Sequence, residues 1–425
     1  MMKNSEQDAS TRGIDRRDFL KTGAAVTAAS VLVPTKAGAQ RPAAATTGPV
    51  LAGDNSYAAK LTAAKGTPSN VPQRPGPPVS IDVHAHWAPE VYMKAKADLG
   101  RPDFINPTNH DLDARAKWMD EHGEQMQVLT LGGFMPWQWV TPEQGVHIAQ
   151  ITNDAALEAH VAYPKRFLFG IELPVGYAEG SLAELNRVAG KPGMVAVHVP
   201  NSLAGREYLF EPAFAPVLAR IEELRLPLLI HPLDGEPNWY AGHRLNDDYS
   251  GGTPGGTASL FPGLTNSVGE TFEQATTVAK LIVSGTMDKY PNLDIIICHA
   301  GGAFPYIVGR MDRGGAGKLK YPVHAYLRRF YFDNLAWYPL SLKYLIDLVG
   351  SDRVVLGTDN MGAQGQPAGG GQNAAAGQNG ERGQNANVSA GGGVPGPHSV
   401  IDQLDLTAED RDLILRGNLK RLFKL

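Results

Sequence analysis

Short runs of apolar and β-branched residues recur between positions 79 and 357, and most of these runs are hydrophobic at nearly every position. Strands that are buried on both faces of a parallel sheet have this continuous pattern. Eight such strands are predicted, at residues 79–83, 127–131, 167–173, 194–199, 227–230, 294–298, 330–332 and 353–357. Helical patterns separate them, at residues 111–122, 142–162, 212–224, 272–290 and 340–349, and a last helix is predicted at 407–423.

This alternation predicts an α/β fold, and a (β/α)8 TIM barrel accounts best for eight strands within about 280 residues. An open, doubly wound sheet is the second choice. It is disfavoured because no glycine-rich phosphate loop follows the first strand.

The first 39 residues have the features of a bacterial twin-arginine export signal. Arg16 and Arg17 precede a mildly apolar run at 22–34, and a small-residue cleavage pattern follows at 37–39. The alternative, a short membrane anchor, is disfavoured because the apolar run is too short to cross a bilayer. We therefore expect a periplasmic or secreted protein without a membrane span in its mature form.

Two other segments differ in composition from the predicted barrel. Residues 40–78, rich in Ala, Thr, Pro and Gly, are predicted to be a flexible linker. Residues 362–397 are a low-complexity tract of Gly, Gln, Asn and Ala, which lacks apolar side chains to bury and is predicted to be a disordered insert. The catalytic domain is accordingly expected to cover residues 79–425.

The overall composition excludes several classes of protein. The chain has 425 residues, with 39 basic and 43 acidic side chains and a formal net charge of −4, so no nucleic-acid partner is expected. Cys298 is the single cysteine, which rules out an intrachain disulfide framework and a thiolate zinc cluster.

Polar side chains that could bind a metal lie at the predicted carboxyl ends of the strands, which meet at one mouth in such a barrel. His84 and His86 are two residues apart, so both side chains point to the same side. His231 ends the fifth strand, where a buried core histidine is the alternative to a ligand. His299 follows the sixth strand as a ligand or a proton-transfer group, and Asp359 follows the eighth. Neutral imidazoles with one carboxylate suit zinc and similar divalent ions.

Other candidates have weaker support from the sequence. His198 lies near the end of the fourth strand and is weakly favoured as a substrate contact or as support for a ligand. Aromatic side chains in predicted mouth loops either line a pocket for a planar acid or pack as ordinary loop residues; these are Trp87, Trp137, Trp139, Trp239, Tyr240 and Trp337.

The motifs together resemble the amidohydrolase superfamily, and more closely its branch of metal-dependent decarboxylases, typified by aminocarboxymuconate semialdehyde decarboxylase. The resemblance is carried by the residues at 81–86 (IDVHAH), 230–232 (IHP), 298–306 (CHAGGAFPY), 356–359 (LGTD) and 417–418 (GN). It covers about residues 79–360 and 400–423. The mouth loops at 99–109, 233–235 and 360–362 depart from the branch's pattern, so the resemblance does not identify the substrate.

The resemblance implies roles for particular residues. His84, His86, His231 and Asp359 would bind one divalent ion, most simply Zn, with Asp359 also serving catalysis. His299 would exchange a proton with a metal-activated water. Substrate contacts would come from Arg310, which would hold a carboxylate and reach towards a neighbouring subunit, and from Trp87 and His198. Relatives in this branch are commonly homodimers, so the resemblance implies the same state here.

The expected activity is non-oxidative decarboxylation of an aromatic or unsaturated carboxylic acid. Two alternatives stay open from the sequence. One is a metal-dependent hydrolase acting on a C–N, lactone or other carbonyl substrate, because the same metal site supports both reactions. The other is a solute-binding protein without catalytic activity.

Overall fold

The computed structural model describes residues 80–100, 110–203, 205–233, 265–314, 319–360 and 400–425. The predicted signal at 1–39, the linker at 40–78 and the insert at 362–397 lie outside these ranges, as do Trp239 and Tyr240.

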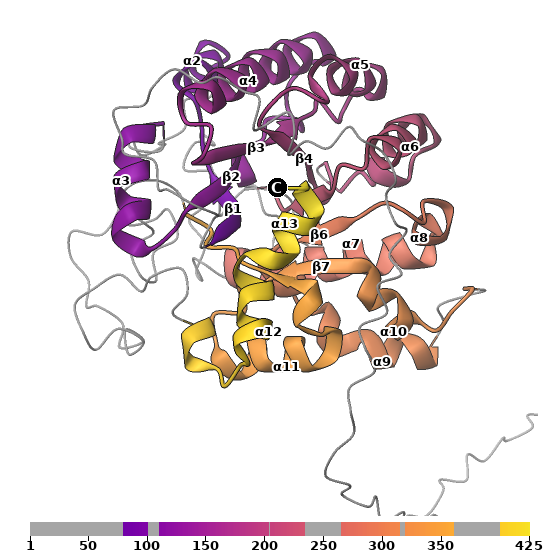
Figure 1. Ribbon diagram of the computed structural model, residues 1–425. Coiled ribbons are helices and arrows are strands. Elements are labelled where there is room, and N and C mark those ends of the chain that lie inside the picture. The colour runs from indigo at the N-terminus through magenta and orange to yellow at the C-terminus, as the bar shows by residue number, and fades with distance from the viewer. Residues whose placement is uncertain (1–79, 101–109, 204, 234–264, 315–318, 361–399) are drawn as a thin grey trace, which may run out of the picture. The chain divides into compact units, whose positions relative to one another are not determined.

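Eight parallel strands pair in sequence order to form the barrel (Figure 1). They are β1 (Ile81–His86), β2 (Met126–Thr130), β3 (Phe167–Glu172), β4 (Met194–Pro200), β5 (Leu228–His231), β6 (Ile295–Ile297), β7 (Phe330–Asp333) and β8 (Val354–Val355). Every residue of these strands is buried. The continuous hydrophobic runs follow from this burial, because helices cover the outer face and side chains fill the interior.

The segment after β8 closes the barrel against β1. The backbone N–H of Val83 donates to the carbonyl of Leu356 at 2.9 Å, and that of Asp359 donates to the carbonyl of His84 at 2.7 Å. A parallel bridge between Ala85 and Asn360 continues the pairing. The first and last strands are therefore neighbours at the mouth.

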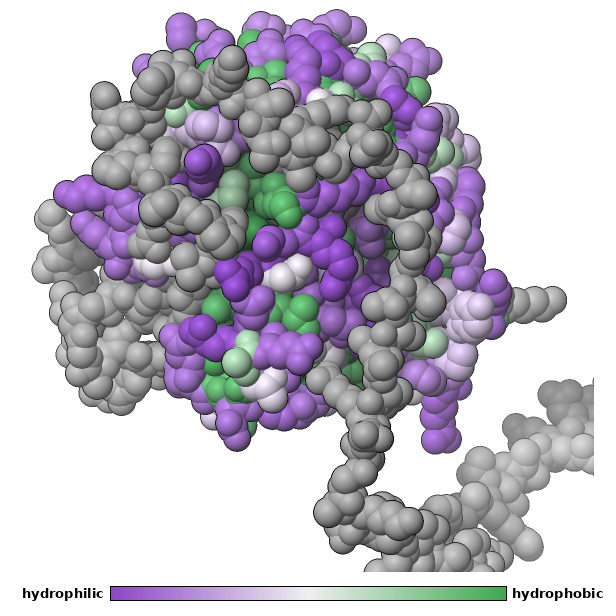
Figure 2. Space-filling model, in the orientation of Figure 1, coloured by the Kyte–Doolittle hydropathy of each residue, from purple (hydrophilic) through white to green (hydrophobic). Residues whose placement is uncertain are grey.

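Helices surround the strands, and the face of the molecule in Figure 2 is mostly hydrophilic where residues are described. The helices are α2 (Glu90–Asp98), α3 (Leu112–His122), α4 (Pro142–Ala162), α5 (Ala178–Val188), α6 (Ala215–Leu224), α7 (Thr271–Val283), α8 (Thr286–Lys289), α9 (Phe304–Gly314), α10 (Val323–Tyr326), α11 (Pro339–Val349), α12 (Ala408–Asp412) and α13 (Asn418–Phe423). The longest, α4, begins with a capping box between Thr141 and Gln144.

Some predicted helix boundaries were wrong. The helix predicted at 272–290 is divided into α7 and α8, because Gly285 has a left-handed backbone with φ of 75°. The helix predicted at 407–423 contains a π-helical turn, Leu413–Gly417, between α12 and α13. The cap by Thr407 is present, since its side chain accepts from the backbone N–H of Asp410.

Candidate active site

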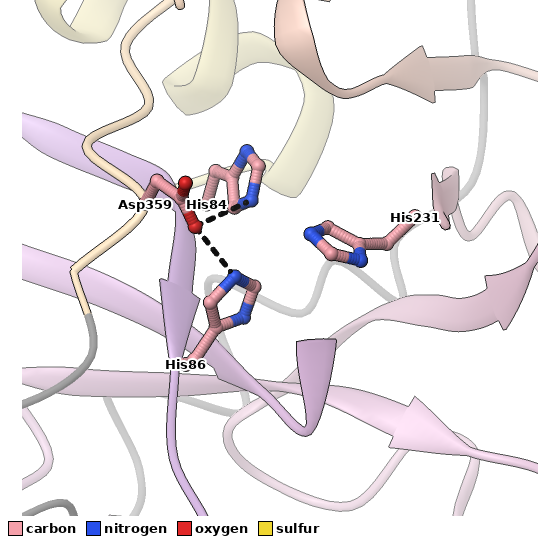
Figure 3. A group of neighbouring side chains, drawn as sticks. All are labelled: His84, His86, His231 and Asp359. Atoms are coloured by element: carbon pink, nitrogen blue, oxygen red, sulfur yellow. Dashed lines mark hydrogen bonds and ion pairs between the residues drawn. The ribbon is translucent and has the colours of Figure 1, made fainter. Parts of the chain in front are cut away.

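Four side chains from distant parts of the chain meet at the carboxyl ends of the strands (Figure 3). His84 and His86 end β1, His231 ends β5, and Asp359 follows β8. One potential ligand atom from each lies within 4.8 Å of those of the other three. Figure 3 shows Asp359 beside the two β1 imidazoles, with His231 opposite.

Hydrogen bonds fix the tautomers of two of these imidazoles. His84 Nδ1 lies 2.7 Å from Asp333 Oδ2, and His231 Nδ1 lies 2.6 Å from the carbonyl oxygen of Pro232. A carboxylate and a carbonyl only accept hydrogen bonds, so both Nδ1 atoms carry the hydrogen. The Nε2 atoms of His84 and His231 are therefore lone-pair donors, and both are buried without a hydrogen-bond partner.

The carboxylate of Asp359 completes the group. Its Oδ1 lies 2.8 Å from His86 Nε2 and 3.5 Å from His84 Nε2. Three imidazoles and one carboxylate are a donor set that divalent transition-metal ions prefer, and buried lone pairs without partners are costly unless such an ion binds them. The residues present fit one divalent cation.

Burial and neighbouring charges set the protonation states that this role requires. Burial lowers the pKa of His86 to about 4 and moves the pKa of His231 well below its usual value. Burial opposes ionisation of Asp359, but the hydrogen bond from His86 and the charge of His84 outweigh it and lower its pKa. Two neutral imidazoles thus face an ionised carboxylate.

His84 differs from the other two imidazoles. Its burial disfavours the charged form, yet contacts with Cys298, Asp333 and Asp359 together raise its pKa well above the usual value. Cation binding requires the neutral form of His84, with hydrogen on Nδ1 and the lone pair of Nε2 available.

His299 lies beside this group without being part of it. Its ring centroid is 5.1 Å from that of His84 and 5.2 Å from that of His231, and its Nε2 is 4.0 Å from Asp359 Oδ2. Burial lowers the pKa of His299, so the ring is neutral at pH 7 and able to accept a proton. Its side chain is 11% exposed, which leaves it a path to a substrate.

A pocket of about 380 Å³ opens directly onto His299 and Asp359. Small and apolar side chains from the loops after β6 and β7 make up much of its wall. Two aromatic side chains, Tyr306 and Tyr344, stack at its edge with ring centroids 4.7 Å apart. Trp337 also lines the pocket and is 58% exposed, whereas Trp137 is buried.

None of the three predicted substrate contacts, Trp87, His198 and Arg310, is among the residues that line this pocket. Trp87 is buried and packs against Phe169 with ring centroids 5.2 Å apart. Arg310 lies exposed on α9 and is not among the residues that line the pocket. His198 is buried, with its ring 6.2 Å from that of His231, and its Nδ1 lies 2.8 Å from Glu172.

Sequence reasoning missed the two carboxylates that orient site histidines, Asp333 for His84 and Glu172 for His198. Asp333 is the last residue of β7 and Glu172 the last residue of β3, so both lie at the same end of the barrel as the ligands. A carboxylate at the end of a strand was therefore the signal that could have found them.

A network of buried polar side chains forms hydrogen bonds to the backbone of β1. Asp82 accepts hydrogen bonds from the backbone N–H of His84 at 2.9 Å and from the side chain of Gln127 at 3.3 Å. Arg115, fully buried, donates to Gln127 and to the carbonyl of His86. Burial raises the pKa of Asp82 to about 7 and lowers that of Arg115 to about 10. The backbone that carries both β1 ligands is thus fixed on its interior side.

Comparison with known proteins agrees with this site. The amidohydrolase family matches residues 81–425. The 2-amino-3-carboxymuconate-6-semialdehyde decarboxylase of Dictyostelium discoideum is 25% identical, with 66% of this chain and 81% of that protein covered. A gamma-resorcylate decarboxylase of Rhizobium sp. is 27% identical, with 66% and 86% covered.

A solved structure has the same fold. It is a dihydroxybenzoic acid decarboxylase from Polaromonas sp. with bound manganese and the inhibitor 2-nitroresorcinol, at a TM-score of 0.60 and 22% identity. The match covers 81% of this chain and 97% of that protein. The predicted TIM barrel is confirmed by this likeness and by the eight parallel strands.

The start of the chain has its own match. Residues 13–33 match the twin-arginine translocation signal, which confirms the predicted export route. Within the residues that the structure describes, the search for a helix with the length and hydropathy needed to cross a bilayer finds none.

Proposed function

The chain belongs to the amidohydrolase family, and from this we propose that it is a metal-dependent carboxy-lyase that removes CO2, without oxidation, from an aromatic carboxylic acid. The observation that carries the proposal is the meeting of three imidazoles and a carboxylate beside a further, neutral histidine. Relatives named as decarboxylases support this reaction over hydrolysis, and the neutral His299 argues against a protein that only binds solutes.

His84, His86, His231 and Asp359 would hold the cation. We propose zinc, because this donor set in a four-coordinate arrangement is common for that ion, although manganese suits the same nitrogen and oxygen donors. When bound, the cation would supply positive charge that stabilises the negative charge developing on the substrate.

The proton must come from a group of the chain or from solvent passed through it. In decarboxylation the C–C bond to the carboxylate breaks, its electron pair stays on the substrate carbon, a proton adds to that carbon, and CO2 leaves. His299 is placed to bring that proton, because it lines the pocket with its Nε2 4.0 Å from Asp359 Oδ2, and its neutral ring can take up a proton from solvent.

The pocket supports an aromatic substrate. Its apolar wall and the stacked tyrosines Tyr306 and Tyr344 suit a planar ring. We propose, as the resemblance implies, that Trp87 and His198 contact the substrate, from outside the set of residues that line this pocket. Arg310, exposed on α9, would bind a carboxylate only in a neighbouring subunit, which is consistent with a homodimer.

We propose the following organisation along the chain. A signal at 1–39 directs export to the periplasm or beyond, a linker covers 40–78, and the catalytic domain covers 79–425 with an insert at 362–397.

A direct assay tests the activity. Mature protein reconstituted with zinc or manganese is given a panel of hydroxybenzoates, unsaturated acids, lactones and amides, while CO2 and acid release are followed together. Decarboxylation of at least one aromatic acid is expected, and His299→Ala should slow it about 10²–10⁴-fold. Turnover of lactones or amides without CO2 release from any acid would refute the proposal.

A further inference from the structure

The carboxylate of Asp333, the last residue of β7, is fully buried and bonded on both oxygens. Its Oδ2 accepts from His84 Nδ1 at 2.7 Å and from the backbone N–H of His299 at 2.9 Å. Its Oδ1 accepts from the backbone N–H groups of Ala300 at 2.8 Å and Leu335 at 3.0 Å. One side chain therefore contacts a predicted metal ligand and the backbone of the predicted proton-transfer residue.

The backbone that Asp333 binds is unfavourable by itself. His299 and Ala300 have φ angles of 51° and 55°, in the left-handed region that side chains with a β-carbon avoid. Two consecutive residues of this kind persist only when the surroundings hold them. The two hydrogen bonds from these residues to Asp333 are such a constraint. They turn the chain after β6 so that the His299 ring faces Asp359.

The same carboxylate decides which nitrogen of His84 faces the other ligands. An ionised carboxylate offers no hydrogen, so His84 must donate from Nδ1 and keep its Nε2 lone pair. That Nε2 is the atom that lies 3.5 Å from Asp359. A histidine with the opposite tautomer would present a hydrogen to the cation instead of a lone pair.

We propose that Asp333 is a positioning residue that couples cation binding to the placement of the proton-transfer histidine. One carboxylate holds the ligand His84 in its binding tautomer and holds the His299 turn in its strained conformation. The part that concerns His299 rests on the proposed function, whereas the part that concerns His84 does not.

Asp333→Asn separates this role from packing, because the shape is kept while one acceptor becomes a donor. If the new NH2 group replaces Oδ2, it faces the donors of His84 and His299, and His84 can relieve this conflict only by moving its hydrogen to Nε2. If it replaces Oδ1, it faces the backbone N–H groups of Ala300 and Leu335 and disturbs the His299 turn instead. We expect the zinc dissociation constant, measured by competition with a chromophoric chelator, to rise about 10- to 100-fold, as for other partners of metal-bound histidines. The control is Glu184→Gln, which neutralises a buried carboxylate on α5 that contacts Asn153 and Arg187 and no ligand of the site, and it should change zinc affinity less than threefold.

A second measurement observes the His84 tautomer in wild-type protein, so it does not depend on how Asp333→Asn folds. In zinc-loaded wild-type protein, ¹⁵N–¹H correlation of the imidazoles, with His84 assigned by its absence in His84→Gln, should show hydrogen on Nδ1 and none on Nε2. Hydrogen on Nε2, or an Asp333→Asn protein that binds zinc as tightly as Glu184→Gln, would overturn the proposal.

Turnover tests the second half of the coupling. With saturating zinc, Asp333→Asn should still lower kcat. If Asp333 acts by placing His299, the same substitution should lower kcat much less in a His299→Ala background, where the histidine is already gone. Equal effects in both backgrounds would overturn the link to His299. Absence of decarboxylation in wild-type protein, with the His84 tautomer as expected, would instead refute the proposed function.

Discussion

Gly132→Ala should displace the ligand His86 from the site although no ligand is itself substituted. Gly132 opens the short 3-10 turn Gly132–Phe134 after β2, with φ of 57°. A β-carbon there would lie 2.0 Å from His86 Nδ1, whereas ordinary contact begins at 3.4 Å. The ring would have to retreat by about 1.4 Å, the difference between these distances. Bonds between a metal and its ligands tolerate displacements of only about 0.2 Å.

The expected result is loss of one ligand. Zinc affinity should fall by about 100-fold or more, because loss of a residue that only hydrogen-bonds to a metal ligand already lowers metal affinity about 10- to 100-fold. The left-handed backbone adds about 1–2 kcal/mol of destabilisation for any residue with a β-carbon. Chelator competition measures the affinity, and urea unfolding of metal-free protein measures the stability.

Gly123→Ala is the matched control for Gly132→Ala. Gly123 ends α3 with φ of 78°, and a β-carbon there meets nothing within 4 Å. Both variants should lose similar stability, but only Gly132→Ala should lose zinc. Equal zinc affinity in the two variants would show that the His86 ring is not held as a ligand where the structure places it.

Four shorter predictions follow from other parts of the chain. His299→Ala should keep one bound ion per chain and lose about 10²–10⁴-fold in kcat; a kcat within threefold of wild type would remove its role. Chelation should lower the melting temperature, because an ion at 100 times its Kd stabilises by about 2.7 kcal/mol. Burial lowers the pKa of His160 in the folded protein, so below about pH 6.5 the unfolded chain binds a proton at this residue that the folded protein does not. The free energy of unfolding should therefore fall from about pH 6.5 towards pH 5, and His160→Gln should flatten this decline in the urea midpoints. Arg16→Lys with Arg17→Lys should leave an uncleaved precursor in the cytoplasm on fractionation.

Much of the fold could be predicted from the sequence, because strands buried on both faces have a distinctive hydrophobic pattern. All eight predicted runs contain or overlap an observed strand. The apolar run at 79–83 covers only part of β1, because the polar His84 and His86 continue the strand; their predicted position at its end is confirmed. Helices α5 and α9 were not among the predicted helices, although both are strongly amphipathic.

The site could be predicted only in part. Strand-end position selects His84, His86, His231 and Asp359, and these four lie together in the structure. The partners that orient them depend on the register between neighbouring strands, which apolar runs do not encode. Asp333 is one example: it reaches His84 from a strand 249 residues further along the chain.

β8 contains only Val354 and Val355, so the last strand contributes little pairing of its own. Asp359 lies beyond it and faces His84 and His86, the latter 273 residues earlier. A cation held by these three residues is therefore also a cross-link that fastens the two ends of the sheet to each other. Starving cells of metal should then leave the protein inactive, with the two ends of the sheet joined only by the backbone hydrogen bonds between β1 and the segment after β8.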